Sequence, residues 1–116
     1  MATRLDDAQL KAAVEKLPGW EVRDGKLARV YRFKDFGDAF AFMCACALRI
    51  HAMDHHPEWS NVYSTVKVEL VTHDAKGITA RDAELAGVME GIAKRFAGAR
   101  AARPATRRCA PSAAVR

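Results

Sequence analysis

The histidines of this chain are concentrated in one stretch. His51, His55 and His56 fall within six residues, and the remaining histidine, His73, lies about one expected strand further along. The imidazole is the side chain whose ordinary pKa lies closest to neutral pH, so it can donate or accept a proton under physiological conditions. The segment 50–82 is therefore where we expect acid–base chemistry.

Pro57 determines the expected setting of the two adjacent histidines. Its ring disfavours helical backbone at His56, so a preceding helix should end there. His55 and His56 are then expected at a helix C-terminus, where the helix dipole favours a positively charged side chain. A nearby carboxylate could fix the tautomer of one imidazole. The candidate carboxylates are Asp54, Asp74 and Asp82.

Two other interpretations of the histidines stay open. A single histidine such as His51 is more often an ordinary residue with a satisfied hydrogen bond. His51 and His55 also lie one helical turn apart, as two metal ligands would, and His73 could supply a third. However, the chain has no H-E-x-x-H motif and no cysteine pair with structural zinc spacing. We therefore predict no metal site.

Composition indicates one folded domain. A chain of 116 residues, half of them hydrophobic, is long enough for one core. We see no apolar run of membrane-spanning length and no signal-peptide pattern at the N-terminus. The three cysteines are odd in number and lack C-x-x-C spacing, which favours a reduced, cytoplasmic protein.

The net charge of +5 comes from the C-terminal end. Residues 97–116 contain five arginines and no acid, and the other 14 basic residues balance 14 acidic ones. We predict a folded domain over residues 1–97 and a disordered basic tail over residues 98–116, because the tail has few large apolar groups. Nucleic-acid binding is not expected.

The patterns predict a helix over 6–17, ended by Pro18-Gly19, and then a hairpin of strands 20–23 and 26–33 around Asp24-Gly25. A second helix should begin at Asp35. Its recurring apolar positions predict a buried stripe, formed by Phe36, Phe40, Met43, Ala47 and Ile50. Cys44 and Cys46 should point to different sides of this helix.

The segment 59–72 predicts two strands with a break near 64–65, and the last helix should start at Thr79. Thr79-x-x-Asp82 is a capping-box pattern, and Gly98 suits the C-terminal cap. The buried stripe of this helix is expected to be Leu85, Met89, Ile92 and Phe96. The predicted fold class is α+β, a small four-stranded antiparallel sheet with three helices packed on one face, in the order helix-strand-strand-helix-strand-strand-helix.

The ordered motifs F-K-D-F, F-x-F-M, D-H-H-P-E-W, N-V-Y, T-H and R-D resemble the pterin-4a-carbinolamine dehydratases over residues 20–96. The resemblance implies a lyase that dehydrates 4a-hydroxytetrahydropterin (4a-hydroxytetrahydrobiopterin) to the quinonoid dihydropterin. It implies no cofactor, a homodimer or homotetramer, and a place in tetrahydrobiopterin recycling beside an aromatic amino acid hydroxylase. An animal member is also a transcriptional coactivator, so a non-catalytic oligomeric binding module is the alternative.

The resemblance also implies the residues of the site. His55, His56 and His73 match the family's histidines and are predicted to be catalytic. We expect His55 and His73 to transfer protons and His56 mainly to bind substrate. The predicted substrate-binding residues are His51, Asp54, Trp59 and Asp82. His51 stands where members often carry an acid, which puts a carboxylate role there in doubt.

Overall fold

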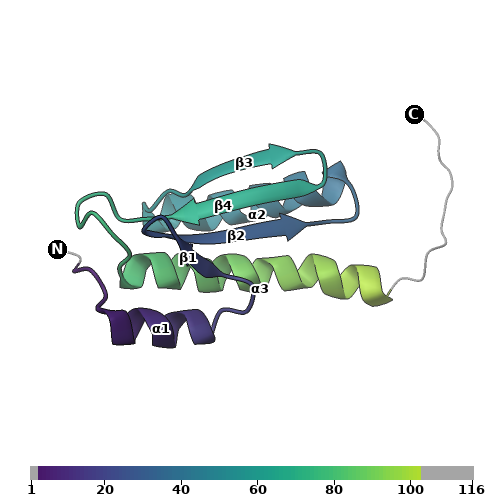
Figure 1. Ribbon diagram of the computed structural model, residues 1–116. Coiled ribbons are helices and arrows are strands. Elements are labelled where there is room, and N and C mark those ends of the chain that lie inside the picture. Colours follow the sequence, from purple (N-terminus) through teal and green to yellow (C-terminus); the bar gives the residue numbers. More distant parts are fainter. Residues whose placement is uncertain (1–2, 103–116) are drawn as a thin grey trace, which may run out of the picture.

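The structure is a computed structural model that describes residues 3–102, with side chains described as far as Phe96. Its elements are α1 (Asp7–Glu15), β1 (Glu21–Arg23), β2 (Lys26–Arg32), α2 (Phe36–Met53), β3 (Glu58–Val62), β4 (Thr65–Leu70) and α3 (Ala80–Ala102). The strands form one antiparallel sheet in the order β1-β2-β4-β3. Figure 1 shows α2 behind the strands. The predicted α+β fold and element order are confirmed.

Local signals account for several element ends. Asp24 and Gly25 both have positive φ, 53° and 78°, as the turn of a two-residue hairpin requires. The carboxylate of Asp35 accepts a hydrogen bond from the backbone N–H of Asp38 and caps α2. These residues fix where the elements begin, and the two-residue turn sets the register of β1 with β2.

The core lies between the inner face of the sheet and the helices α2 and α3. Its fully buried members include Leu27, Phe42, Val66, Leu70, Leu85 and Met89. Tyr31 brings one polar group into this layer, and its hydroxyl donates to Glu90 Oε1 of α3 at 2.7 Å. Burial is the main cause that raises the pKa of Tyr31, and this hydrogen bond is the second. The phenol therefore stays protonated and acts as a donor between sheet and helix.

The buried stripe of α2 differs from the predicted one. Phe36 and Phe40 are 49% and 51% exposed, while the buried residues of this helix are Ala39, Phe42, Cys46 and Ile50. Both faces of the helix are apolar, so periodicity alone could not tell which of them meets the sheet. The expectation that Cys44 and Cys46 point to different sides is confirmed, because Cys44 is exposed and Cys46 buried.

Two further expectations need correction. α3 continues through Gly98 to Ala102, so the predicted end at Gly98 is wrong; residues 103–116 of the predicted tail lie outside the described residues. Within residues 3–102, α2 is by length and composition apolar enough to cross a membrane, contrary to the expectation from sequence. It nevertheless packs against β3, β4 and α3, as the central helix of a folded domain does.

The orientation of α2 can be tested at Cys46. This side chain is fully buried, and burial raises the pKa of its thiol to about 12. Because the thiolate is the reactive form, Cys46 should resist iodoacetamide at pH 8 in the native protein and react after unfolding in urea. Peptide mass spectrometry measures this, and equal labelling rates in the two states would contradict the packing described.

Candidate functional site

The end of α2 sets the position of the histidine pair. The helix ends at Met53, and Asp54 adopts the left-handed conformation with φ 51° and ψ 44°. Its backbone N–H still donates to the carbonyls of His51 and Ile50, which closes the last turn. The predicted helix end before Pro57 is confirmed, and it leaves His55 and His56 on the short turn that leads into β3.

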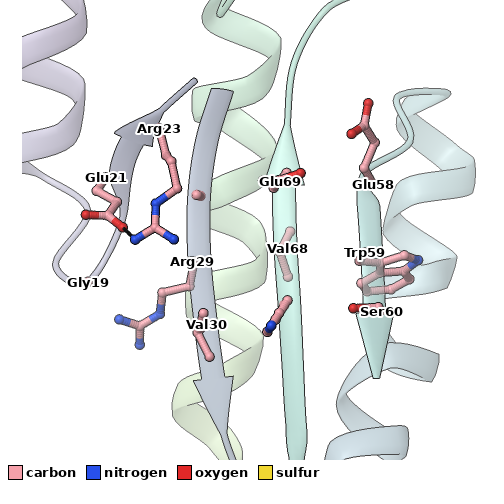
Figure 2. Close-up of a pocket in the computed structure, with 12 residues that line it drawn as sticks. Gly19, Glu21, Arg23, Arg29, Val30, Glu58, Trp59, Ser60, Val68 and Glu69 are labelled. Atoms are coloured by element: carbon pink, nitrogen blue, oxygen red, sulfur yellow. Dashed lines mark hydrogen bonds and ion pairs between the residues drawn. The ribbon is translucent and has the colours of Figure 1, made fainter. Parts of the chain in front are cut away.

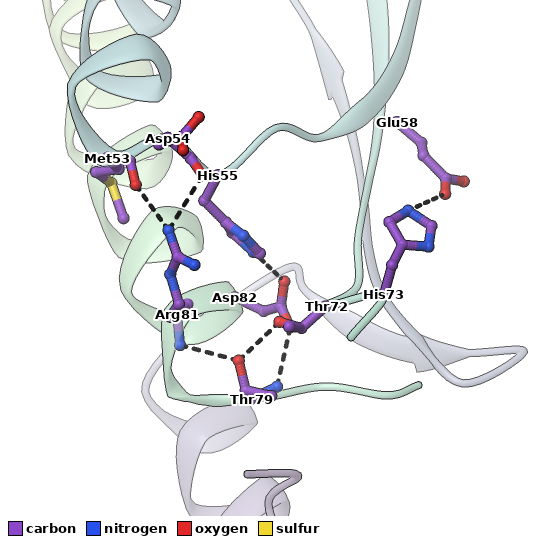
Figure 3. Close-up of polar contacts among 9 residues, drawn as sticks. All are labelled: Met53, Asp54, His55, Glu58, Thr72, His73, Thr79, Arg81 and Asp82. Carbon is purple, nitrogen blue, oxygen red and sulfur yellow. Dashed lines mark hydrogen bonds and ion pairs between the residues drawn. The ribbon is translucent and has the colours of Figure 1, made fainter. Parts of the chain in front are cut away.

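His55 turns inward and contacts Asp82. The ring is only 8% exposed and the carboxylate is fully buried. His55 Nε2 lies 2.6 Å from Asp82 Oδ1 (Figure 3). If Asp82 is ionised, its carboxylate only accepts hydrogen bonds and the hydrogen of this contact is on Nε2, with Nδ1 on the other edge of the ring.

Two threonines hold the carboxylate of Asp82 in place. Its Oδ2 accepts from the backbone N–H of Thr79 at 2.9 Å and from the hydroxyl of Thr72 at 2.8 Å. A hydroxyl has one hydrogen, so the Thr79 hydroxyl is the donor in its 2.7 Å contact with Thr72. The Thr79–Asp82 contact is half of the predicted capping box, and the same carboxylate thus caps α3 and orients His55.

His56 points to a different place. Together with His51, Pro57 and Trp59 it lines a pocket of about 240 Å³ at the C-terminal end of α2. Both histidines are exposed and Trp59 is half-buried. The pocket combines an indole with two imidazoles, which suits a flat heterocycle with hydrogen-bonding edges.

His73 lies on the loop after β4 and is 79% exposed. Its Nε2 is 3.6 Å from Glu58 Oε2. Glu58 also accepts a hydrogen bond from Lys26 at 2.7 Å. This hydrogen bond, with the charges of Lys26 and His73, lowers the pKa of Glu58 despite its desolvation, so Glu58 is ionised at neutral pH and attracts a protonated His73.

A larger cavity of about 540 Å³ lies on the outer face of the sheet. Ala28, Glu69 and Glu58 are aligned across β2, β4 and β3 on this face, and Figure 2 shows the helices behind the strands. The lining mixes acids with arginines and contains no histidine. Trp59 is the predicted site residue that borders both this cavity and the smaller pocket.

The structure therefore distributes the predicted residues over three settings. His55 and Asp82 form a buried pair, His51, His56 and Trp59 share a pocket, and His73 lies outside with Glu58. Asp54 contributes its backbone at the helix end, and its side chain is exposed. Among residues 3–102 no group of three or more potential ligands could hold a metal ion. The absence of a metal site stays a prediction.

Sequence reasoning missed Glu58, Thr72 and Arg81 as partners of the site. Glu58 follows Pro57, and Thr72 precedes His73, and both of these neighbours had been identified from the sequence. Strand alternation could have indicated Thr72, because neighbours on an extended segment point to opposite sides. The contact of Arg81 with the end of α2 spans 28 residues of sequence, and no local pattern indicates it.

Fold and site together define a small α+β domain with a histidine site at the junction of two helices. The sequence model described as Pterin 4 alpha carbinolamine dehydratase matches residues 3–92. A protein of Rhodopseudomonas palustris (strain BisB18), provisionally named pterin-4-alpha-carbinolamine dehydratase, is 53% identical over 95 residues, 80% of this chain and 94% of that protein. A Prochlorococcus marinus (strain MIT 9303) protein with the same provisional name is 54% identical over 85 residues, 73% of this chain and 88% of its own.

A solved structure agrees with these sequence relatives. A crystal structure of a transcriptional coactivator/pterin dehydratase from Brucella melitensis superposes with a TM-score of 0.76 at 42% identity, covering 78% of this chain and 99% of the other. The chain belongs to the pterin-4a-carbinolamine dehydratase family.

The role of Asp82 in holding the site together can be measured. Asp82→Ala would leave the His55 ring, the Thr72 hydroxyl and the Thr79 N–H without their acceptor. Buried groups left unpaired typically cost about 1–3 kcal/mol each. We expect urea unfolding to show a loss of about 3–5 kcal/mol, the usual cost of removing one partner from a buried pair.

Asp74→Ala is the matched control for this variant, because Asp74 is an exposed carboxylate in the loop between Thr72 and Thr79. It should change the unfolding free energy by less than about 0.5 kcal/mol. Equal effects of the two substitutions would contradict the structural role assigned to Asp82.

Proposed function

We propose that this protein is a lyase that removes water from 4a-hydroxytetrahydropterin and gives the quinonoid dihydropterin in tetrahydrobiopterin recycling. Family membership and the names of the relatives support the reaction. Within the molecule, the observation that carries the proposal is the buried His55–Asp82 pair at 2.6 Å. A carboxylate that fixes the orientation of an imidazole is a common device for proton transfer.

The reaction requires one proton to arrive and one to leave. The C–O bond at the ring carbon breaks as a proton is delivered to the hydroxyl, which departs as water. The neighbouring ring nitrogen loses its proton, and the electron pair left on this nitrogen forms the C=N bond. No electrons are exchanged with another molecule, so two imidazoles near neutral pH can perform the proposed step without a metal or an organic cofactor.

We assign proton transfer to His55 and His73, and substrate binding mainly to His56. Each of the first two presents Nε2 to a carboxylate, Asp82 for His55 and Glu58 for His73. A carboxylate stabilises the imidazolium that forms when the ring accepts a proton. His56 instead lines the pocket with His51 and Trp59, a setting that suits binding of the pterin ring.

The proposed substrate also implies a neighbouring enzyme. Hydroxylation of an aromatic amino acid with a tetrahydropterin is the class of reaction that supplies the hydroxylated pterin in this proposal. We also propose a cytoplasmic location, from the odd number and the spacing of the cysteines in the sequence.

A second candidate is a non-catalytic oligomeric binding module or transcriptional coactivator. The description of the Brucella melitensis structure names both a coactivator and a dehydratase. This description supports the binding module as a second candidate. A direct assay separates the two candidates, because only an enzyme accelerates dehydration of chemically generated 4a-hydroxytetrahydropterin. The assay follows the quinonoid product by absorbance with purified protein and no added metal.

We expect His55→Ala and His73→Ala each to slow dehydration strongly. A positioned acid or base typically contributes about a hundredfold to ten-thousandfold in rate, so kcat should fall within that range. The measurement is kcat per folded molecule, with the folded fraction determined by circular dichroism. Near wild-type rates in both folded variants would exclude this site and favour the binding module.

His51→Ala provides the internal comparison for these variants. His51 is exposed at the rim of the small pocket. If it only borders the pocket, its variant should keep a nearly wild-type kcat. A slow His51 variant with a displaced pH optimum would instead show that His51 takes part in the reaction.

We also propose a homo-oligomer, a homodimer or homotetramer, formed through the outer face of α2. Phe36, Phe40 and Leu48 leave this face apolar, with exposed fractions of 49%, 51% and 76%. Contiguous exposed apolar surface commonly marks an interaction site. Sedimentation velocity at micromolar concentration should show a dimer or a tetramer, and Phe40→Glu should shift it toward monomer.

Val62→Glu is the control for the α2 contact, because Val62 is also exposed, at 74%, but lies on the edge strand β3. It should leave the sedimentation coefficient unchanged. The reverse pattern, in which only Val62→Glu yields monomer, would place the contact at the sheet edge and contradict the role of α2.

A further inference from the structure

We infer that Arg81 is a positioning residue, which fastens the turn carrying His55 and His56 to the first turn of α3. The inference deepens the proposed function, on which its kinetic readout rests. Arg81 belongs to the R-D pair that opens α3. Its partner in the pair, Asp82, has an evident role in the site, whereas the sequence assigned none to Arg81.

The contact joins two distant segments through one nitrogen. Arg81 Nη2 donates to the carbonyl of Met53 at 2.7 Å and to that of Asp54 at 3.1 Å (Figure 3). These carbonyls end α2, where the last C=O groups have no partner within the helix. A guanidinium also suits the negative end of the helix dipole. Arg81 therefore caps α2 from outside.

The adjacent residues Arg81 and Asp82 thus hold the same turn at two points, one on its backbone and one on a side chain. Asp82 holds the ring of His55 in the interior, and Arg81 holds the backbone immediately before it near the surface. Neither contact alone would fix His55. With only the Arg81 contact the His55 ring could rotate about its side-chain bonds, and with only the Asp82 contact the backbone of the turn could move. Both contacts together fix the backbone and the ring of His55, and with them the direction in which His56 enters its pocket.

The conformation of Asp54 supports this role. Its φ of 51° lies in a region that residues with side chains occupy sparsely, and such conformations persist where the surroundings fix them. Arg81 binds the carbonyl of this same residue. Loss of the guanidinium should loosen the left-handed turn, while the apolar core, which lies elsewhere on α2 and α3, stays intact.

The test compares three variants in the dehydration assay. Arg81→Met keeps most of the aliphatic stem and removes the guanidinium, and we expect kcat to fall between about tenfold and a hundredfold, the scale of an ångström-sized misplacement. Arg81→Lys keeps the charge and should recover part of the loss. Arg95→Met removes an exposed arginine roughly 21 Å further along the same helix and should match wild type.

A second readout does not depend on activity. The hydrogen on His55 Nε2, in its short buried contact with Asp82, should give a downfield proton NMR signal that exchanges slowly with water. Arg81→Met should broaden this signal through faster exchange, and Arg95→Met should leave it sharp. If wild-type protein shows no dehydration but the signal responds to Arg81→Met in this way, the positioning role stands and the proposed function fails.

The opposite result would overturn the inference. A merely structural Arg81 predicts that Arg81→Met lowers the melting temperature yet keeps both kcat per folded molecule and the sharp His55 signal. If Arg81→Met does not fold, Arg81→Lys decides the question, because it keeps a cation at the helix end but lacks the guanidinium. A wild-type kcat and a wild-type His55 signal in Arg81→Lys would also exclude a requirement for the guanidinium.

Discussion

The contact between His55 and Asp82 is the constraint on which the rest of the site depends. A fully buried carboxylate is costly unless each oxygen is paired, so Asp82 needs Thr72, Thr79 and His55 at the same time. These partners come from the end of α2, the segment after β4 and the start of α3. The hydrogen bonds of one side chain therefore fix how three chain segments meet at the site, while the apolar core packs the sheet against α2 and α3.

The sequence predicted those features that a few neighbouring residues decide. The Asp24-Gly25 turn, the end of α2 before Pro57 and the contact between Thr79 and Asp82 each depend on positions at most four apart. The element order and the antiparallel pairing followed, because short connections leave few ways to arrange four strands. Of the predicted α3 stripe, Leu85, Met89 and Ile92 are buried, and Phe96 is half-buried against the core.

Features that depend on which surfaces meet were beyond the sequence. α2 has apolar residues on both faces, so the stripe through Phe36 and Phe40 looked as suitable for the core as the one through Phe42 and Cys46. Arg81 and Glu58 resemble ordinary surface charges until the fold brings them to the end of α2 and to His73. A single polar residue carries no periodic signal, and its role becomes visible only when its partner is located.

The segment Thr72-His73 explains why His55 is buried and firmly held while His73 is exposed and loosely held. Thr72 is buried and donates to Asp82, whereas the next residue, His73, begins the turn after the Thr72–Gly77 bridge and is exposed beside Glu58. His55 is consequently fixed by a short, buried hydrogen bond. His73 has only a 3.6 Å contact, longer than a good hydrogen bond, and little burial to restrain it. One imidazole is thus held in place by a short buried contact, and the other is restrained only by a longer contact at the surface.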